Sequence, residues 1–194
     1  MKSNPRGSPR IRLISSFAML VLVIGGALVY SVRTTSELFD RGVDDHARCT
    51  LAGSYSRQTK PAEMASALGH FAPLLEPLMK ADRINNAEGE DQLVAAWECA
   101  ASGRTDADIV LRRGQTLISV IIARRDDRQA FPRVLAGRVI EAAGISLHEA
   151  TRAGYSVAAF ESGAYLGYVV SALPVAKNTD LAARLAPVIV RYAF

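Results

Sequence analysis

The chain has two cysteines, and a histidine lies close to the first of them. His46 and Cys49 are three positions apart, and Cys99 is the only other cysteine. In an oxidising compartment the two thiols would form a disulfide, whereas in the reduced state they could bind a soft metal ion together with the imidazole. These residues leave two hypotheses, a Cys49–Cys99 disulfide or a metal or thiol site made of His46, Cys49 and Cys99.

Asp106 and Asp108 form a second candidate group. Alternate residues of a strand point to the same face, so these two carboxylates could act as a pair of acids if they lie on a strand. We interpret them instead as the solvated beginning of a strand, beside Arg104 and Arg112. Ser119 lies in an apolar segment without a base nearby in the sequence, and we interpret it as an ordinary sheet residue.

The sequence lacks the common catalytic and cofactor motifs. It contains no Gly-x-Ser-x-Gly nucleophile turn, no phosphate-binding or dinucleotide-binding glycine loop, no His-Glu-x-x-His and no Cys-x-x-Cys-His. The sequence therefore predicts a protein that is not an enzyme and that has no cofactor and no catalytic residues.

The basic residues are concentrated at the N-terminus. The chain has 23 Lys and Arg against 19 Asp and Glu, and Lys2, Arg6, Arg10 and Arg12 all precede residue 13. The rest of the chain then holds 19 residues of each sign. Because a nucleic-acid-binding surface needs an excess of cationic side chains, we expect no nucleic-acid partner.

Residues 13–32 form a run of 20 residues without a charged side chain. As a helix rising 1.5 Å per residue, this run would cross a hydrocarbon core of about 30 Å. Because residues 1–12 are purely basic, the positive-inside rule places them in the cytoplasm and the chain after the span outside. A cleaved signal peptide is the alternative, but its apolar region would be shorter, about 7–15 residues. The sequence predicts an uncleaved single-span anchor.

This topology decides between the two hypotheses for the cysteines. Cys49 and Cys99 both follow the span and would lie on the oxidising side of the membrane, where disulfides form. A bridge between them would close a loop of about 50 residues, and in the chain-entropy model it would stabilise the fold by about 4 kcal/mol. We therefore predict the Cys49–Cys99 disulfide and keep the metal site as the alternative.

The remainder of the chain is divided into a polar connector, residues 33–45, and one domain, residues 46–194. Strand-like composition occurs in five segments, which are 93–99, 107–112, 116–123, 155–160 and 164–171. Helices are expected in 59–78, in 131–143 with Gly144 as the C-cap, and from Asn178 or Thr179 to Tyr192. The sequence predicts an α+β domain with a mainly antiparallel sheet of about five strands and helices packed on one face.

Three groups of residues follow one another in this domain. The first is Asp45-His46-Ala47-Arg48-Cys49, and the second is Cys99 with the hairpin that ends in residues 117–121. The third comprises residues 157–161, 165–174, Asn178 and 185–187. In this order and spacing they resemble the extracytoplasmic domain of bacterial transmembrane anti-sigma factors, over about residues 44–194.

The resemblance implies a single-span protein of the bacterial inner membrane with a sensing or regulatory domain in the periplasm. Such anti-sigma factors also carry a cytoplasmic zinc-binding domain with a His-x-x-x-Cys-x-x-Cys motif that holds the sigma factor. Residues 1–12 contain neither His nor Cys, so they lack zinc ligands, and we do not expect direct binding of a sigma factor.

Two functions follow as expectations. The first is a membrane-anchored regulatory or sensing module that acts through contacts with a protein partner in the membrane or the periplasm. The alternative is a periplasmic protein that handles a metal or thiols through His46, Cys49 and Cys99.

Overall fold

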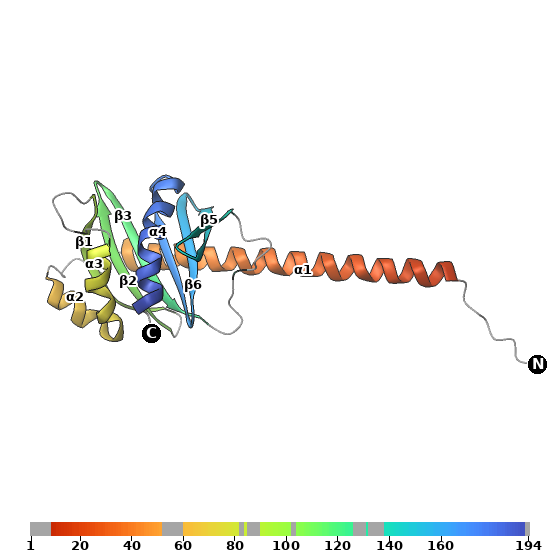
Figure 1. Cartoon of the computed structure of the whole chain (residues 1–194), viewed down its shortest axis with the longest axis horizontal. Coiled ribbons are helices and arrows are strands. Elements are labelled where there is room, and N and C mark those ends of the chain that lie inside the picture. The colour runs from red at the N-terminus through yellow and green to blue at the C-terminus, as the bar shows by residue number, and fades with distance from the viewer. Residues whose placement is uncertain are drawn as a thin grey trace, which may run out of the picture.

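The computed structural model describes residues 9–51, 60–81, 84, 90–101, 104–125, 131 and 138–192. A domain of strands and helices lies at one end of a long helix that extends far beyond it (Figure 1). This helix, α1, spans Pro9–Asp45 and continues into one π-helical segment, η1, at His46–Leu51. Residues 33–45, the predicted connector, form the last part of α1.

The domain is built on one antiparallel sheet of seven strands. Its strands are β1 (Gln92–Ala101), β2 (Arg104–Arg113), β3 (Thr116–Arg124), β4 (Arg138–Ala142), β5 (Ile145–Arg152), β6 (Tyr155–Ser162) and β7 (Tyr165–Ser171). Their order is β1-β2-β3-β7-β6-β5-β4. Two meanders, β1–β3 and β4–β7, meet where β3 pairs with β7. The α+β class and the antiparallel sheet are confirmed, and the count of about five strands is too low.

The two unexpected strands form the hairpin β4–β5. The predicted helix over 131–143 is wrong where the structure describes it, because Arg138–Ala142 is a strand; residues 132–137 of that prediction lie outside the described residues. Ala143 and Gly144 join the strands with φ of 52° and 78°. Positive φ at both central residues is typical of the tight turn that matches the twist of two strands. The glycine that suggested a helix end therefore serves a hairpin turn.

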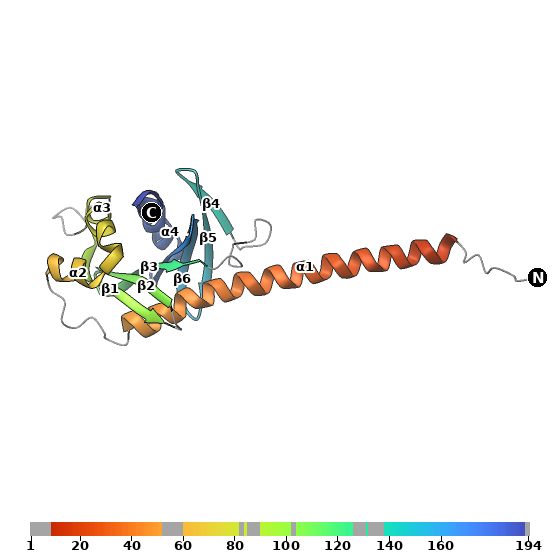
Figure 2. The same ribbon diagram turned by 90° about the horizontal axis from the view of Figure 1, so that it is seen from below.

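One face of the sheet is covered by four helical segments, α2 (Pro61–Ala67), η2 (Gly69–Leu74), α3 (Leu75–Ala81) and α4 (Val175–Tyr192) (Figure 2). Their buried leucines and isoleucines pack with Ile109, Ile118 and Phe160 of the strands in the main apolar core. Helix α4 begins before the expected Asn178. That side chain is buried, donates to the Val169 carbonyl and accepts from the Ser171 hydroxyl.

The opposite face is covered by the last turns of α1 and by η1, which pass across the strands (Figure 2). Leu38, Phe39 and Val43 of α1 pack on Tyr168 and other buried residues of this face. A Cβ on Gly42 would lie 2.9 Å from Cδ1 of Tyr168, so the glycine lets α1 approach the sheet closely. Helices therefore pack on both faces rather than one. Both faces of β3 are accordingly buried, over six consecutive residues, 118–123.

Candidate functional site

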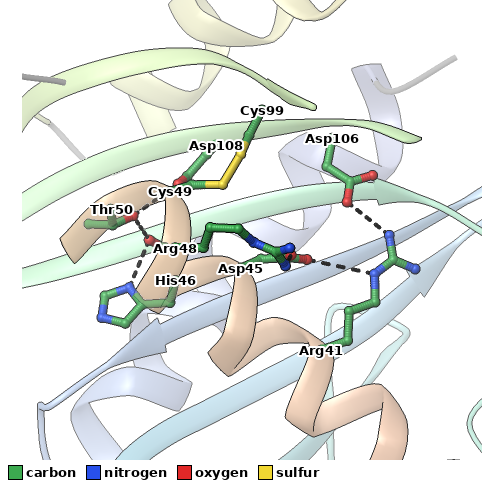
Figure 3. Close-up of a disulfide and its surroundings, with 10 residues drawn as sticks. Arg41, Asp45, His46, Arg48, Cys49, Thr50, Cys99, Asp106 and Asp108 are labelled. Atoms are coloured by element: carbon green, nitrogen blue, oxygen red, sulfur yellow. Dashed lines mark hydrogen bonds and ion pairs between the residues drawn. A yellow bond between two sulfur atoms is a disulfide. The ribbon is translucent and has the colours of Figure 1, made fainter. Parts of the chain in front are cut away.

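A disulfide joins η1 to the first strand of the sheet. Cys49 of η1 and Cys99 of β1 are bonded, with their Cα atoms 6.5 Å apart. Cys49 is buried and packs with Ala95, Trp97 and Val110. The predicted pair is therefore present in the structure, and it ties the end of α1 covalently to an outer strand of the sheet (Figure 3).

Beside the disulfide lies a group of polar side chains enclosed between the helix end and the sheet, which we call the polar joint. It consists of Arg41, Asp45, His46, Thr50, Asp106, Asp108 and Ser119. Helix α1 supplies Arg41 and Asp45, η1 supplies His46 and Thr50, and β2 supplies Asp106 and Asp108 (Figure 3). Strand β3 supplies Ser119.

Ion pairs make up the first half of the polar joint. Arg41 donates from Nη2 to Oδ2 of Asp106 at 2.9 Å, and its Nε lies 3.7 Å from Asp45 Oδ2. The half-exposed Arg48 donates to the other Asp45 oxygen at 2.9 Å. Burial and the charge of Asp106 raise the pKa of Asp45, and the two arginines oppose this rise. Burial alone would lower the pKa of Arg41, but Tyr168 and Asp106 raise it overall.

Hydroxyl groups make up the second half. Thr50 Oγ1 is 2.9 Å from Asp108 Oδ2 and is also hydrogen-bonded to Ser119 Oγ. Ser119 Oγ lies 2.8 Å from Nδ1 of His46. Asp108, Thr50, Ser119 and His46 thus form one continuous chain, and none of the four is more than 1% exposed.

The surroundings shift the pKa values of Asp108 and His46, the two titratable ends of this chain, in opposite directions. Burial raises the pKa of Asp108 to about 7, with a further rise from the Asp45 charge and a partial reduction from hydrogen bonds to Thr50 and Ser119. Burial lowers the pKa of His46 to about 4. The His46 and Tyr155 rings also lie edge to face, with their centroids 5.0 Å apart. Both end groups are therefore disposed to be uncharged in the folded protein.

The structure contradicts one interpretation of single residues and adds a distant partner to another. Asp106 and Asp108 are 3% and 1% exposed, so they are not the solvated beginning of a strand. They do share one face of β2, as the alternation predicts, but α1 and η1 cover that face. Ser119 is a residue of β3, as expected, and it is also hydrogen-bonded to His46 of η1, a base that is 73 positions away in the sequence.

The alternative metal site is not assembled in this structure. The sulfurs of Cys49 and Cys99 are bonded to each other, and His46 Nδ1 is bonded to Ser119. Among the residues that the structure describes, no cluster of three or more His, Cys, Asp or Glu side chains is arranged to hold a metal ion. Because the polar joint is closed to solvent, its arrangement suits holding two elements together or storing a proton.

A comparison of the chain with protein-family models, with curated proteins and with solved structures finds no match. The resemblance to the extracytoplasmic domain of anti-sigma factors therefore stays a prediction.

Proposed function

We propose that the chain is a single-span membrane protein whose folded domain lies on the extracytoplasmic side and regulates or senses through contacts with another protein. One observation carries the proposal. Helix α1 is continuous from an apolar, exposed half to a half that is docked on the sheet and followed directly by a disulfide.

The exposed half of α1 supports the membrane anchor. The large apolar residues that follow Met19 as far as Val32 are exposed, with Leu22 at 75% and Val23 at 66%. Water disfavours such a continuous apolar surface, whereas lipid solvates it. By length and composition this helix could cross a membrane. The basic residues before it favour a cytoplasmic N-terminus.

The disulfide supports the extracytoplasmic side. Structural disulfides persist in oxidising compartments and are rare in the cytosol. The bond joins η1, which follows directly on α1, to β1, so the domain would be fastened to the end of the helix that leaves the membrane.

The fixed attachment of α1 supports a regulatory role. Ion pairs from Arg41, apolar contacts from Phe39 and the Cys49 bridge together restrain α1 against sliding or rotating on the sheet. A partner that binds the domain would therefore displace or rotate the membrane span with it, and a change in the membrane would reorient the domain.

A helix-phase experiment tests this coupling in cells. One α-helical residue turns the helix by about 100°, so two alanines inserted between Val32 and Arg33 would rotate the domain by about half a turn. Seven inserted alanines make about two full turns and nearly restore the original phase. The measurement is the set of transcripts that changes when the gene is deleted. We expect the two-residue insertion to mimic the deletion and the seven-residue insertion to resemble the wild type.

Two outcomes would contradict regulation through the helix. The deletion could leave transcription unchanged, or both insertions could behave as the wild type. Each variant must first be shown to reach the membrane at the wild-type level. The matched seven-residue insertion controls for added length.

Topology is tested separately. A fluorescent protein that matures only in the cytoplasm, fused after Phe194, should remain dark. Alkylation of the protein denatured directly from cells, without and with prior reduction, should label Cys49 and Cys99 only after reduction. Bright fusions would overturn the orientation. Full labelling without reduction, with zinc or copper bound to the purified protein, would favour the metal or thiol function of His46, Cys49 and Cys99.

A further inference from the structure

Among the described residues, no cation acts on the carboxyl end of the hydrogen-bonded chain in the polar joint. Arg41 and Arg48 pair with Asp106 and Asp45, and the groups that act on Asp108 are two hydroxyls and the negative charge of Asp45. Its Oδ1 is buried without a hydrogen-bond partner among the described residues. A fully buried carboxylate without a cation is costly, and such a group lowers the cost by keeping its proton.

The other members of the chain can accept and pass on a hydrogen bond donated by a protonated Asp108. Thr50 and Ser119 each have one hydroxyl hydrogen to donate and lone pairs to accept. A neutral imidazole accepts at whichever ring nitrogen lacks hydrogen. If Nδ1 of His46 lacks hydrogen, Ser119 donates to it, Thr50 donates to Ser119, and a proton on Asp108 Oδ2 is donated to Thr50. Every hydrogen bond in the chain then runs in the same direction, from Asp108 to His46.

We propose that Asp108, Thr50, Ser119 and His46 form a buried proton-binding site, in which Asp108 is a neutral carboxylic acid and the hydrogen-bonded chain ends on Nδ1 of His46. The same atoms permit a second state. When the proton leaves, Thr50 donates to the Asp108 carboxylate, Ser119 donates to Thr50, and His46 must carry its hydrogen on Nδ1 to donate to Ser119. Loss of the proton therefore reverses the chain and changes the tautomer of His46.

The elements that pack against the site place charged and aromatic groups around it. Helix α1 presents Arg41 and Asp45, β2 presents Asp106, and β6 presents the Tyr155 ring. The arginine is engaged by two aspartates, and the negative charge of Asp45 favours a protonated neighbour. The raised pKa of Asp108, about 7, agrees with this arrangement.

The site lies where α1 joins the domain, which gives the proton a structural effect. Thr50 is adjacent to Cys49 in η1, and the chain is the polar contact that bonds η1 to β2 and β3. A negative charge on Asp108 would be repelled by the negative charge of Asp45 and would weaken this contact. The inference rests on the geometry of the joint and holds whether or not the chain is anchored in a membrane.

Nitrogen-15 NMR of the full chain in detergent micelles, labelled at histidine, tests the proposal. The chain has three histidines, and the His46 signals are those that disappear in His46→Asn. We expect His46 to be the Nε2–H tautomer about one pH unit below the pKa of Asp108 and the Nδ1–H tautomer about one unit above it. An Nδ1–H tautomer at both pH values, or a tautomer that never changes, would overturn the proposal.

Two variants make the test specific. Ser119→Ala breaks the chain between its ends and should abolish the tautomer change. Asp106→Asn removes a carboxyl that is paired with Arg41 and should leave the change in place. The infrared spectrum of the wild type gives a measurement that needs no variant, because a protonated carboxyl has a carbonyl band that a carboxylate lacks. Absence of that band below the pKa of Asp108 would also overturn the proposal.

Discussion

The two faces of the sheet are buried by different kinds of side chain. The face under α4 is covered by leucines, isoleucines, valines and Phe160. The face under α1 is divided. Its half around Phe39 and Tyr168 is apolar, and its half around Asp108 is the polar joint. Apolar burial stabilises without regard to pH. Buried charged and hydroxyl groups add little net stability and make a joint specific and sensitive to pH.

The largest expected effect is on the α4 face. Phe160 is fully buried and its ring lies directly over Gly167, where an added Cβ would come within 2.2 Å of the ring. Phe160→Ala should lower the free energy of unfolding by about 3–5 kcal/mol, because the cavity cannot close over the sheet backbone. Urea denaturation of the full chain in micelles measures it. The loss should be equal on both sides of neutral pH, and a pH-dependent loss would contradict the contrast between the faces.

Removing one partner of the Arg41–Asp106 ion pair on the α1 face should destabilise the fold more than removing both. Arg41→Met leaves Asp106 buried without its cation and should cost about 3 kcal/mol. Arg41→Met combined with Asp106→Leu removes both charges and should restore most of that loss, because a buried ion pair is often replaceable by apolar residues. A double-mutant cycle in urea measures the coupling. Additive losses would show that Arg41 and Asp106 stabilise the joint independently of each other.

The disulfide should contribute to the free energy of unfolding independently of the polar joint. Cys49→Ser with Cys99→Ser should lower the free energy of unfolding by about 2–4 kcal/mol, because the unfolded chain regains the freedom of a long loop. Reduced wild-type protein is the matched control and should unfold at the same denaturant concentration. A loss in the variant without a loss on reduction would assign the effect to the serines instead.

Much of this contrast was predictable from local sequence. The uncharged run of residues 13–32, the number of cysteines and the strand-like composition of residues 116–123 predicted the apolar helix, the bridge and one strand of the sheet. The polar joint was not predictable, because it depends on α1 continuing through residues 33–45 and crossing the sheet. His46 and Ser119 are 73 positions apart, and spacing within either segment says nothing of their meeting.

A weak signal for the joint was nevertheless present. Asp106, Asp108 and Ser119 are polar residues that share one face of adjacent strands, in a region where the other face is fully apolar. Polar residues on a strand ordinarily mark a solvated face. A polar helix segment that covers such a face gives the same pattern, so sequence alone could not separate the two.

The free energy of unfolding should depend on pH through two groups, His46 and Asp108, which are the titratable ends of the hydrogen-bonded chain. His46 has its pKa lowered to about 4 by burial, so the unfolded state takes up a proton below about pH 6.5 that the folded state refuses, and stability is lost as pH falls towards 4. Asp108 has its pKa raised to about 7. The folded state keeps a proton that the unfolded state releases above about pH 3.9, and stability is lost as pH rises towards 7.

These slopes oppose each other in the wild type between about pH 4 and 6.5. Asp108→Asn should therefore lose stability on acidification, and His46→Asn should gain it, each by up to about 1.4 kcal/mol per pH unit. Urea midpoints across this range measure both slopes, with Phe160→Ala as the control that keeps the wild-type slope. Parallel slopes in the two variants would contradict opposite shifts at the two ends.

The smallest expected effect lies outside both faces, in the hairpin turn between β4 and β5. Ala143 has a φ of 52°, a conformation that is unfavourable for alanine and better tolerated by asparagine. Ala143→Asn should raise the free energy of unfolding by about 0.5 kcal/mol, because Asn-Gly is a preferred pair for this turn. Ala153→Asn, in the equivalent turn between β5 and β6 with a φ of 48°, is the matched variant and should give a similar gain. Both gains should be independent of pH, since neither turn contacts the polar joint. A loss in either variant would show that the turn is held by contacts that asparagine disrupts rather than by the backbone preference.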